Sequence, residues 1–259
     1  SKAQRDHYKQ PTGKNMVLEH VDEPDLYRDV FPYTEVPKLT WDPAPEVPAA
    51  PPDEPVITCT TFRDGQQARP PYSVKQIVDL FDMMSKLSGP NGVIRQCEFF
   101  LYSDKDKEAV DKCRQLGRRY PEITGWIRAS KTDFKLVKEM GLAETGILTS
   151  SSDYHIFLKM NKTREAAMQD YLDLVREAIE AGVKPRCHLE DLTRADIYGF
   201  IVPYVQELMK IQEDSGVPVK VRLCDTMGYG IPYPGAALPR SVPKLVDVMR
   251  RECGVPKDW

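Results

Sequence analysis

The chain has 259 residues and nearly balanced charge, with 36 Lys and Arg against 39 Asp and Glu and a formal net charge of −3. That balance gives no reason to expect nucleic acid or an anionic membrane as a partner. No apolar run approaches the ~20 residues of a membrane span, and the first residues, SKAQRDHYKQ, lack the apolar core of a signal peptide.

This length is enough to bury a sizeable core, as one large domain or two small ones. No C-x-x-C pair occurs among the six cysteines. Four of them fall in predicted strands and two in predicted helices: Cys59, Cys97, Cys187 and Cys224, then Cys113 and Cys253. That use is typical of buried thiols in a reducing compartment, which predicts a soluble cytoplasmic protein rather than a disulfide framework or a zinc site.

Residues 1–55 form a segment of distinct composition, and residues 56–259 are predicted to be the main domain. The stretch VPKLTWDPAPEVPAAPPDEP is too rich in proline for a helix or a central strand and predicts an extended, polyproline-like chain. It is either a disordered leader or a strap lying on the folded body. The aromatic residues Tyr27, Phe31, Tyr33 and Trp41 favour the strap, since disordered tails are poor in them.

Strands and helices alternate from Val56 onward. VITCTT predicts a buried strand, and SVKQIVDLFDMMSKLS predicts a helix with Ser73 as its N-cap. Five further strand segments follow, each with a helix after it: VIRQCEFFLY, ITGWIRAS, TGILTSSS, KPRCHLED and VKVRLCDTMG. About six βα units with a parallel sheet are therefore predicted, either as an open doubly wound sheet or as a (β/α)₈ barrel that stops short of eight.

Charged residues occur repeatedly in these otherwise apolar strands. Alternation along KPRCHLED places Arg186, His188 and Glu190 on one face, while Glu98 and Arg128 are single charges in the second and third strands. Each charge alone is typical of a structural ion pair or an exposed edge. Because a buried charge is costly unless paired, together they predict a polar pocket at one end of the sheet.

Arg63-Asp64-Gly65 with Gln67 resembles the R-D-G-x-Q signature of the DRE-TIM metallolyase superfamily, which includes isopropylmalate, homocitrate, citramalate and Re-type citrate synthases and hydroxymethylglutaryl-CoA lyases. Segments resembling the family's later strand ends follow in the family's order, from Glu98 through Thr149-Ser150-Ser151-Ser152-Asp153-Tyr154-His155 to Asp225-Thr226-Met227-Gly228-Tyr229. The resemblance covers roughly residues 56–230 and implies an α/β fold of the TIM-barrel type.

The resemblance also implies roles for single residues. Asp64 resembles the carboxylate ligand of a divalent metal, Mg²⁺ or Mn²⁺, and Arg63 resembles the residue that stabilises a developing alkoxide. Thr226 is similar to a residue that hydrogen-bonds the carboxylate of a 2-oxo acid, and Glu190 to a carboxylate that helps to enolise acetyl-CoA. The remaining substrate-binding residues implied are Gln67, Glu98, Arg128, Arg186 and His188.

Several positions depart from the family. Gln66 replaces a common Glu, and Ser130 stands where homocitrate synthases carry a substrate-selecting His. His188 replaces a small residue, and we hypothesise that it reads a second carboxylate together with Arg186, which favours oxaloacetate and Re-type citrate synthesis. The His-x-His pair that completes the family's metal site is not found in residues 1–259, so we expect an N-terminal part of the barrel, an inactive fragment that binds metal weakly and does not turn over.

The implied function is a metal-assisted condensation of acetyl-CoA with a 2-oxo acid by an acyltransferase, in a homodimer. Two alternatives stay open at this point. One is a 3-hydroxyacyl-CoA lyase, which uses the same metal and Arg63, and the other is a non-catalytic scaffold paralogue.

Overall fold

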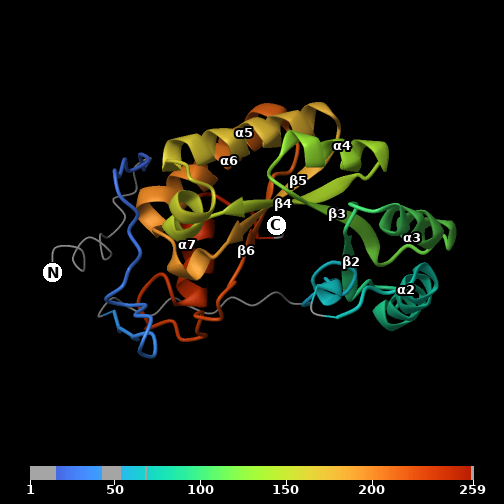
Figure 1. Cartoon of the computed structure of the whole chain (residues 1–259), viewed down its shortest axis with the longest axis horizontal. Helices are drawn as coiled ribbons and strands as arrows, with labels where there is room; N and C mark the ends of the chain where they lie inside the picture. The colour runs from blue at the N-terminus through green and yellow to red at the C-terminus, as the bar shows by residue number, and fades with distance from the viewer. Residues whose placement is uncertain (1–15, 43–53, 68, 258–259) are drawn as a thin grey trace. The chain divides into compact units, whose positions relative to one another are not determined.

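A computed structural model of the protein describes residues 16–42, 54–67 and 69–257 (Figure 1). The proline-rich prediction for residues 43–53 falls outside these ranges. The described residues form two compact units. Unit 1 takes in residues 16–42, 149–177 and 187–257, and unit 2 takes in residues 54–67, 69–148 and 178–186.

Six strands form one sheet in the order β1-β2-β3-β4-β5-β6. The paired registers from β1 to β4 are parallel. The strands are β1 Ile57–Cys59, β2 Ile94–Phe99, β3 Glu122–Arg128, β4 Glu144–Ser150, β5 Lys184–Glu190 and β6 Lys220–Leu223. A doubly wound sheet reverses its strand order at a switch point, whereas a barrel adds each strand beside the previous one. The consecutive order of the strands therefore shows an incomplete TIM-barrel-like fold with six βα units, as the sequence predicted.

A helix follows each strand. Their bounds are α2 Val74–Ser88, α3 Asp104–Gln115, α4 Lys131–Glu139, α5 Arg164–Glu180, α6 Val202–Ser215 and α7 Val242–Arg251. Ser73 caps α2 as predicted, accepting a hydrogen bond from the Gln76 backbone N–H while the Gln76 side chain accepts from Ser73. Such caps satisfy backbone donors that the first helical turn leaves free, which fixes where the helix begins.

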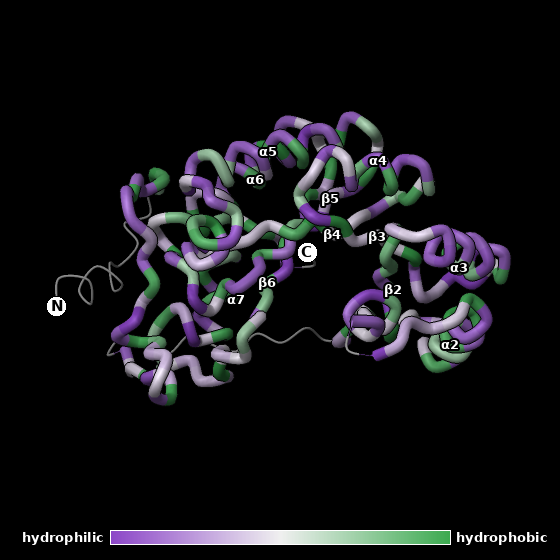
Figure 2. Tube along the Cα trace, in the orientation of Figure 1, coloured by the Kyte–Doolittle hydropathy of each residue, from purple (hydrophilic) through white to green (hydrophobic). Residues whose placement is uncertain are grey.

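Unit 2 is built around β1 to β3 with α2 and α3 side by side (Figure 1). α2 buries Ile77 and Phe81, and Phe81 contacts Phe99 of β2 at 6.1 Å between ring centroids. α3 is almost wholly hydrophilic along its trace (Figure 2) and buries only Ala109, Val110 and Cys113. A polar helix of this kind is held by a narrow apolar stripe against its neighbours.

Residues 16–42, called the strap below, pack within unit 1. The Asp25 backbone N–H donates to Asp153 at 2.9 Å, and the fully buried Arg164 binds both Asp153 and Asp196. Further along, Phe31 stacks on Tyr229 at 5.0 Å between ring centroids. The division at residue 55 that the composition suggested remains a prediction.

Two element ends were predicted too late in the sequence. β6 ends at Leu223, so Cys224 and Thr226 lie in the loop after it, and α7 ends at Arg251, before Cys253. Gly228, at φ 69°, and its polar neighbours form a turn that Asp225 closes by accepting from the Tyr229 and Gly230 backbone N–H groups. Because these hydrogen bonds hold the backbone in a turn, the strand ends before it.

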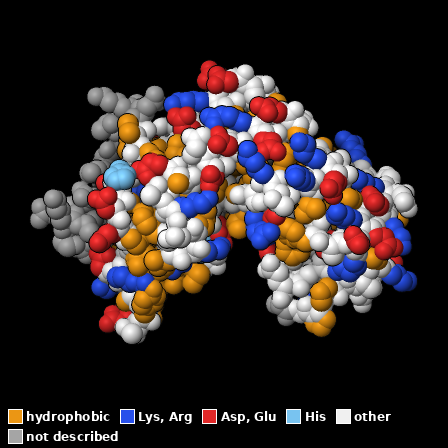
Figure 3. Space-filling model, turned by 45° about the horizontal axis from the view of Figure 1, so that its top comes forward, with side chains coloured by type: hydrophobic (Ala, Val, Ile, Leu, Met, Phe, Trp, Pro, Cys, Tyr) orange, Lys and Arg blue, Asp and Glu red, His pale blue; other side chains and the backbone are white. Residues whose placement is uncertain are grey.

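All six cysteines are free thiols. In the described part of the chain, no helix has both the length and the apolar composition needed to cross a membrane. Acidic and basic side chains are mixed over the face seen in Figure 3, as the near-zero net charge leads one to expect.

Candidate active site

Arg63 lies in a cluster of charges in unit 2, in the loop between β1 and α2. It precedes a short 3-10 helix, Asp64–Gln66, that begins soon after β1 ends. Its guanidinium donates to Asp64 Oδ1 at 2.7 Å and forms an ion pair through Nε with Glu98 Oε2 at 2.9 Å. The guanidinium carbon also lies 4.7 Å from the centre of the Trp126 ring. These three contacts fix the position of a permanent positive charge.

Glu98 is fully buried and joins Arg63 to a second arginine. Arg186 donates from Nη2 to Glu98 Oε1 at 2.8 Å, and from Nη1 to Gln96 and Glu144. A buried carboxylate is tolerated because two guanidinium groups compensate its charge. Arg186, predicted to contact substrate, is therefore itself held by side chains of unit 2, and through Glu98 it supports Arg63.

Gln67 and Arg128 line a pocket of about 420 Å³ in unit 2. The other lining residues are Phe100, Tyr102, Trp126 and Leu148. Arg128 donates to both oxygens of Asp133 at 2.8 and 3.0 Å, although two thirds of its side chain is exposed. The pocket has an aromatic wall with one guanidinium and one amide, a lining that suits a small organic acid.

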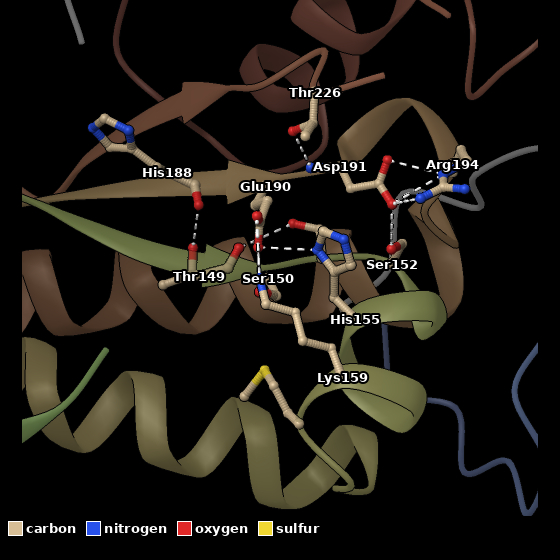
Figure 4. A network of polar contacts seen from close by, with 12 residues as sticks. Thr149, Ser150, Ser152, His155, Lys159, His188, Glu190, Asp191, Arg194 and Thr226 are labelled. Atoms are coloured by element: carbon tan, nitrogen blue, oxygen red, sulfur yellow. Dashed lines mark hydrogen bonds and ion pairs between the residues drawn. The ribbon is translucent and has the colours of Figure 1, made fainter. Parts of the chain in front are cut away.

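Glu190, the last residue of β5, is the centre of a polar cluster in unit 1 (Figure 4). Its carboxylate accepts from Ser150 Oγ at 2.5 Å and lies 3.0 Å from His155 Nδ1 and 3.3 Å from Lys159 Nζ. Burial raises the pKa of Glu190, but hydrogen bonds from His155 and Ser150, with the nearby charges, outweigh burial and lower the pKa to about 2. Glu190 is therefore ionised at neutral pH.

Thr226 lies beside the residue that follows Glu190. Its Oγ1 accepts the Asp191 backbone N–H at 2.8 Å, and Asp191 adopts a left-handed conformation with φ 63° (Figure 4). The Asp191 carboxylate is held in turn by Ser152 and Arg194. A hydroxyl that accepts one hydrogen bond keeps its own proton for another acceptor, so Thr226 can still donate to a ligand.

His188 is buried, and its backbone carbonyl accepts from Thr149 Oγ1 at 2.9 Å. In Figure 4 its imidazole lies apart from the carboxylate of Glu190. The predicted site residues thus form two groups. Arg63, Asp64, Gln67, Glu98, Arg128 and Arg186 belong to unit 2, while His188, Glu190 and Thr226 belong to unit 1.

Asp64 was predicted to hold a divalent metal. Its carboxylate is about half exposed and pairs with Arg63, so an oxygen atom is accessible to a hard cation. Within the described ranges, no group of three or more His, Cys, Asp and Glu side chains is arranged to hold a metal ion. Asp64 fits the role of one metal ligand, and the described residues do not supply the rest of the coordination shell.

Sequence reasoning missed several members of these clusters. Gln96 and Glu144, which bind Arg186, were not predicted as members of the cluster, because isolated polar residues in strands are often exposed. Ser150 and His155 belong to the segment Thr149–His155 that resembles the family, and Lys159 follows that segment, but no role was assigned to any of the three. Their spacing, with His155 and Lys159 four residues apart on one turn after β4, was the signal that could have identified them.

The fold and the strand-end clusters define the class, an α/β protein of the TIM-barrel type with charged groups after successive strands. A sequence model described as "HMGL-like" matches residues 54–253, and the chain belongs to this family of the DRE-TIM superfamily. The solved hydroxymethylglutaryl-CoA lyase of Pseudomonas aeruginosa aligns with a TM-score of 0.55 at 17% identity, over 78% of this chain and 65% of that one. At this identity the likeness shows the fold alone.

Two curated relatives are more similar in sequence. A citrate (Re)-synthase of Syntrophus aciditrophicus is 62% identical over 239 residues, which is 92% of this chain and 38% of the relative. A 2-phosphinomethylmalate synthase of Streptomyces hygroscopicus is 38% identical over 242 residues, 91% of this chain and 54% of the relative. The chain thus spans about half, or less, of the length of the curated relatives it matches.

Proposed function

We propose that the chain belongs to an acyltransferase that condenses acetyl-CoA with oxaloacetate to form citrate, as the name of its 62% identical relative suggests. The structural observation that carries the proposal is the fixed guanidinium of Arg63, which lies in the loop after β1 and is held by Asp64 and Glu98. A permanent positive charge in a fixed position suits a reaction in which negative charge develops on a keto oxygen.

We assign the binding of the oxo acid to the polar residues that the family resemblance indicates. The Thr226 hydroxyl would donate to the carboxylate next to the keto group, because it already accepts from Asp191 and keeps its proton. Gln67 and Arg128 line the aromatic pocket of unit 2 and would contact the acid there. His188 and Arg186 are kept, from the resemblance alone, as the proposed readers of its second carboxylate.

The chemical step would use Arg63 and Glu190. Arg63 would stabilise the alkoxide that forms when the acetyl methyl carbon attacks the keto carbon. Glu190, which is ionised at neutral pH, would support enolisation of acetyl-CoA as a hydrogen-bond acceptor fixed by Ser150 and His155. A divalent cation, with Asp64 as one ligand, would polarise the keto group when bound.

Steady-state assays of the full-length gene product test the proposal by following release of free CoA thiol. Oxaloacetate, pyruvate and 2-oxoisovalerate are compared as partners of acetyl-CoA, and we expect the highest kcat/KM for oxaloacetate. Preference for the branched monocarboxylic acid would overturn the substrate assignment. Faster cleavage of a 3-hydroxyacyl-CoA would select the lyase, and binding without turnover would select a non-catalytic paralogue.

Arg63→Gln tests the proposed charge. We expect kcat to fall about 10²- to 10³-fold, the usual loss when one preorganised donor is removed. Arg118→Gln is the matched control in unit 2, because Arg118 pairs with Asp82 at the surface and should leave kcat unchanged. The proposed homodimer is checked on the same samples by size-exclusion chromatography with light scattering.

A further inference from the structure

The strap presents an arginine at the strand ends of unit 1. Tyr27 has a φ of 47°, a left-handed conformation that is uncommon for a residue with a side chain, and its backbone carbonyl accepts from both Val30 and Phe31. The Tyr27 side chain is buried, which holds the turn in place. Backbone strain of this kind persists only where the surroundings enforce it and is found most often at functional positions. The turn carries Arg28.

Arg28 is packed between two aromatic rings. Its guanidinium carbon lies 3.2 Å from the centre of the Tyr33 ring and 4.7 Å from that of Tyr154. Tyr154 also faces Arg194, whose guanidinium carbon is 3.9 Å from its ring centre. Arg194 is neutralised by the Asp191 carboxylate at 2.7 Å. Tyr154 is thus a platform that holds two guanidinium groups, of which one is paired.

Arg28 has no acidic partner among the residues that the structure describes. Its Nη1 is buried without a hydrogen-bond partner, and the hydroxyl of Tyr154 is also buried without one. The neighbouring Asp29 makes no ion pair with it within the described ranges, although one Asp29 oxygen is also buried without a partner. A buried donor without an acceptor destabilises a protein, and a charged donor does so more strongly. Two such donors close together are complementary to an oxyanion.

The position of this group relates it to the proposed reaction. Tyr154 follows β4, Arg194 follows β5 and Tyr229, stacked on Phe31, follows β6. The carboxyl ends of parallel strands are where barrels of this type bind ligands. Glu190, Asp191 and Thr226 lie at these ends too (Figure 4).

The strap lies before the family match, which begins at residue 54. The match to citrate (Re)-synthase covers 239 of the 259 residues, so at most 20 residues remain outside it and the 27-residue strap is at least partly included. At least part of the strap is therefore shared with this relative, whereas the family match does not include it. An arginine from such a segment can add a specificity that the common barrel lacks.

We propose that Arg28 and Tyr154 form an anion-binding subsite in which the Arg28 guanidinium and the Tyr154 hydroxyl donate to one oxyanion of a substrate. The subsite rests on the proposed function for the identity of that substrate. Both a carboxylate and a phosphate can accept two parallel hydrogen bonds from one guanidinium. The oxyanion is either a carboxylate of the oxo acid or a phosphate of the acyl-CoA, and the two sources predict different kinetic results.

The test uses Arg28→Gln, Arg28→Lys and Tyr154→Phe in the full-length gene product. If the oxo acid supplies the oxyanion, Arg28→Gln raises the KM for oxaloacetate about 10- to 100-fold and leaves the KM for acetyl-CoA unchanged, as expected for one lost charge-assisted hydrogen bond. If the phosphate supplies the oxyanion, Arg28→Gln instead raises the KM for acetyl-CoA and leaves the KM for oxaloacetate unchanged. Tyr154→Phe should raise the same KM by a smaller factor, and Arg28→Lys should be intermediate because it keeps the charge without the planar fork.

A binding measurement separates this proposal from the proposed function. Malonate and free CoA are added separately to each variant, and the rise in Tm is recorded, since a ligand of the folded state raises it without turnover. Arg28→Gln should lose the rise caused by one of these two probes. Arg176→Gln is the matched control, because Arg176 is an exposed arginine of unit 1 paired with Asp173.

Two results would overturn the proposal. In the first, Arg28→Gln matches wild type in both KM values and in both Tm shifts. In the second, Arg28→Gln loses the Tm rise with malonate and with free CoA to the same extent, and Arg28→Lys loses as much as Arg28→Gln. That result would mean that the arginine only supports the strap. If wild type fails to condense any oxo acid, the proposed function fails, while the Tm shifts still decide for or against the subsite.

Discussion

The polar clusters of the two units compensate their buried carboxylates in different ways. In unit 2, Glu98 is enclosed by two arginines, whose charge does not change at any ordinary pH. In unit 1, Glu190 is held by a hydroxyl, an imidazole and a lysine, with 16% of its side chain exposed. The first carboxylate is thus compensated by two guanidinium groups, whereas the second is held by three side chains of different chemistry.

This difference suits the roles that we propose. Stabilising an alkoxide requires a charge that is always present and does not move, and Arg63 with Glu98 provides it. Supporting enolisation as a hydrogen-bond acceptor requires an anion that is held in place but still partly accessible, and Glu190 is held in this way by Ser150 and His155. The predictions below test whether the two clusters really differ, starting with the largest expected effect.

Glu98→Gln should destabilise unit 2 strongly. The change keeps the shape of the side chain but leaves the guanidinium groups of Arg63 and Arg186 without their shared counter-charge in the interior. Removing one partner of a buried ion pair costs about 3–5 kcal/mol. Urea unfolding at pH 7 measures the loss. Asp79→Asn breaks an exposed ion pair with Lys75 in the same unit and should change little.

Gly199→Ala should destabilise unit 1 by about 1–3 kcal/mol, the usual cost of overpacking. A Cβ at this position would overlap the Asp196 carboxylate and approach Glu19 of the strap at 2.8 Å. Gly65→Ala is the comparison in unit 2, because the nearest atom to its Cβ would be Thr61 Cγ2 at 3.6 Å. Thermal unfolding of both variants checks this, and an equal loss of Tm would contradict the packing described here.

Glu190 should make the stability of unit 1 depend on pH. Its pKa is lowered from 4.5 to about 2 in the folded protein, so its contribution is present above pH 4.5 and is lost as the pH falls towards 2. Allowing for solvent screening, the contribution is about 1–2 kcal/mol. Urea unfolding of wild type and Glu190→Gln between pH 2 and 6 should give curves that converge at the acidic end. Parallel curves would show that Glu190 is not held as an anion.

Cys59 should react with iodoacetamide near neutral pH without a loss of stability. Hydrogen bonds from Cys97 and Thr61 lower the pKa of this half-buried thiol to about 6, against the opposing effect of burial. Its rate of alkylation should therefore level off above about pH 7. Mass spectrometry of tryptic peptides identifies the labelled residue. Buried Cys113, with a pKa raised to about 12 by burial, is the internal control and should stay unlabelled.

Local patterns were enough to predict most of the elements. The apolar run VIRQCEFFLY predicted β2, and the spacing of apolar residues in SVKQIVDLFDMMSKLS predicted α2, because a strand or a helix must turn one face to the core. Ser73, as the N-cap, marked the start of α2. The loop after β6 was not predicted, since VKVRLCDT continues the strand pattern beyond Leu223. There, Asp225 accepts backbone N–H groups of the following turn, and that local competition ends the strand.

The sequence by itself determined the alternation of strands and helices, the strand-end charges and the resemblance from which roles for Arg63, Asp64 and Glu190 are proposed. Only the tertiary structure decided how those charges are compensated. Gln96, Glu98, Glu144 and Arg186 come from three strands, and residues distant in sequence can be matched to one another only when the strands are placed side by side. The same holds for Arg28, whose aromatic partner Tyr154 lies 126 residues later in the chain. Side-chain periodicity is a property of one segment, whereas electrostatic pairing is a property of the packed molecule.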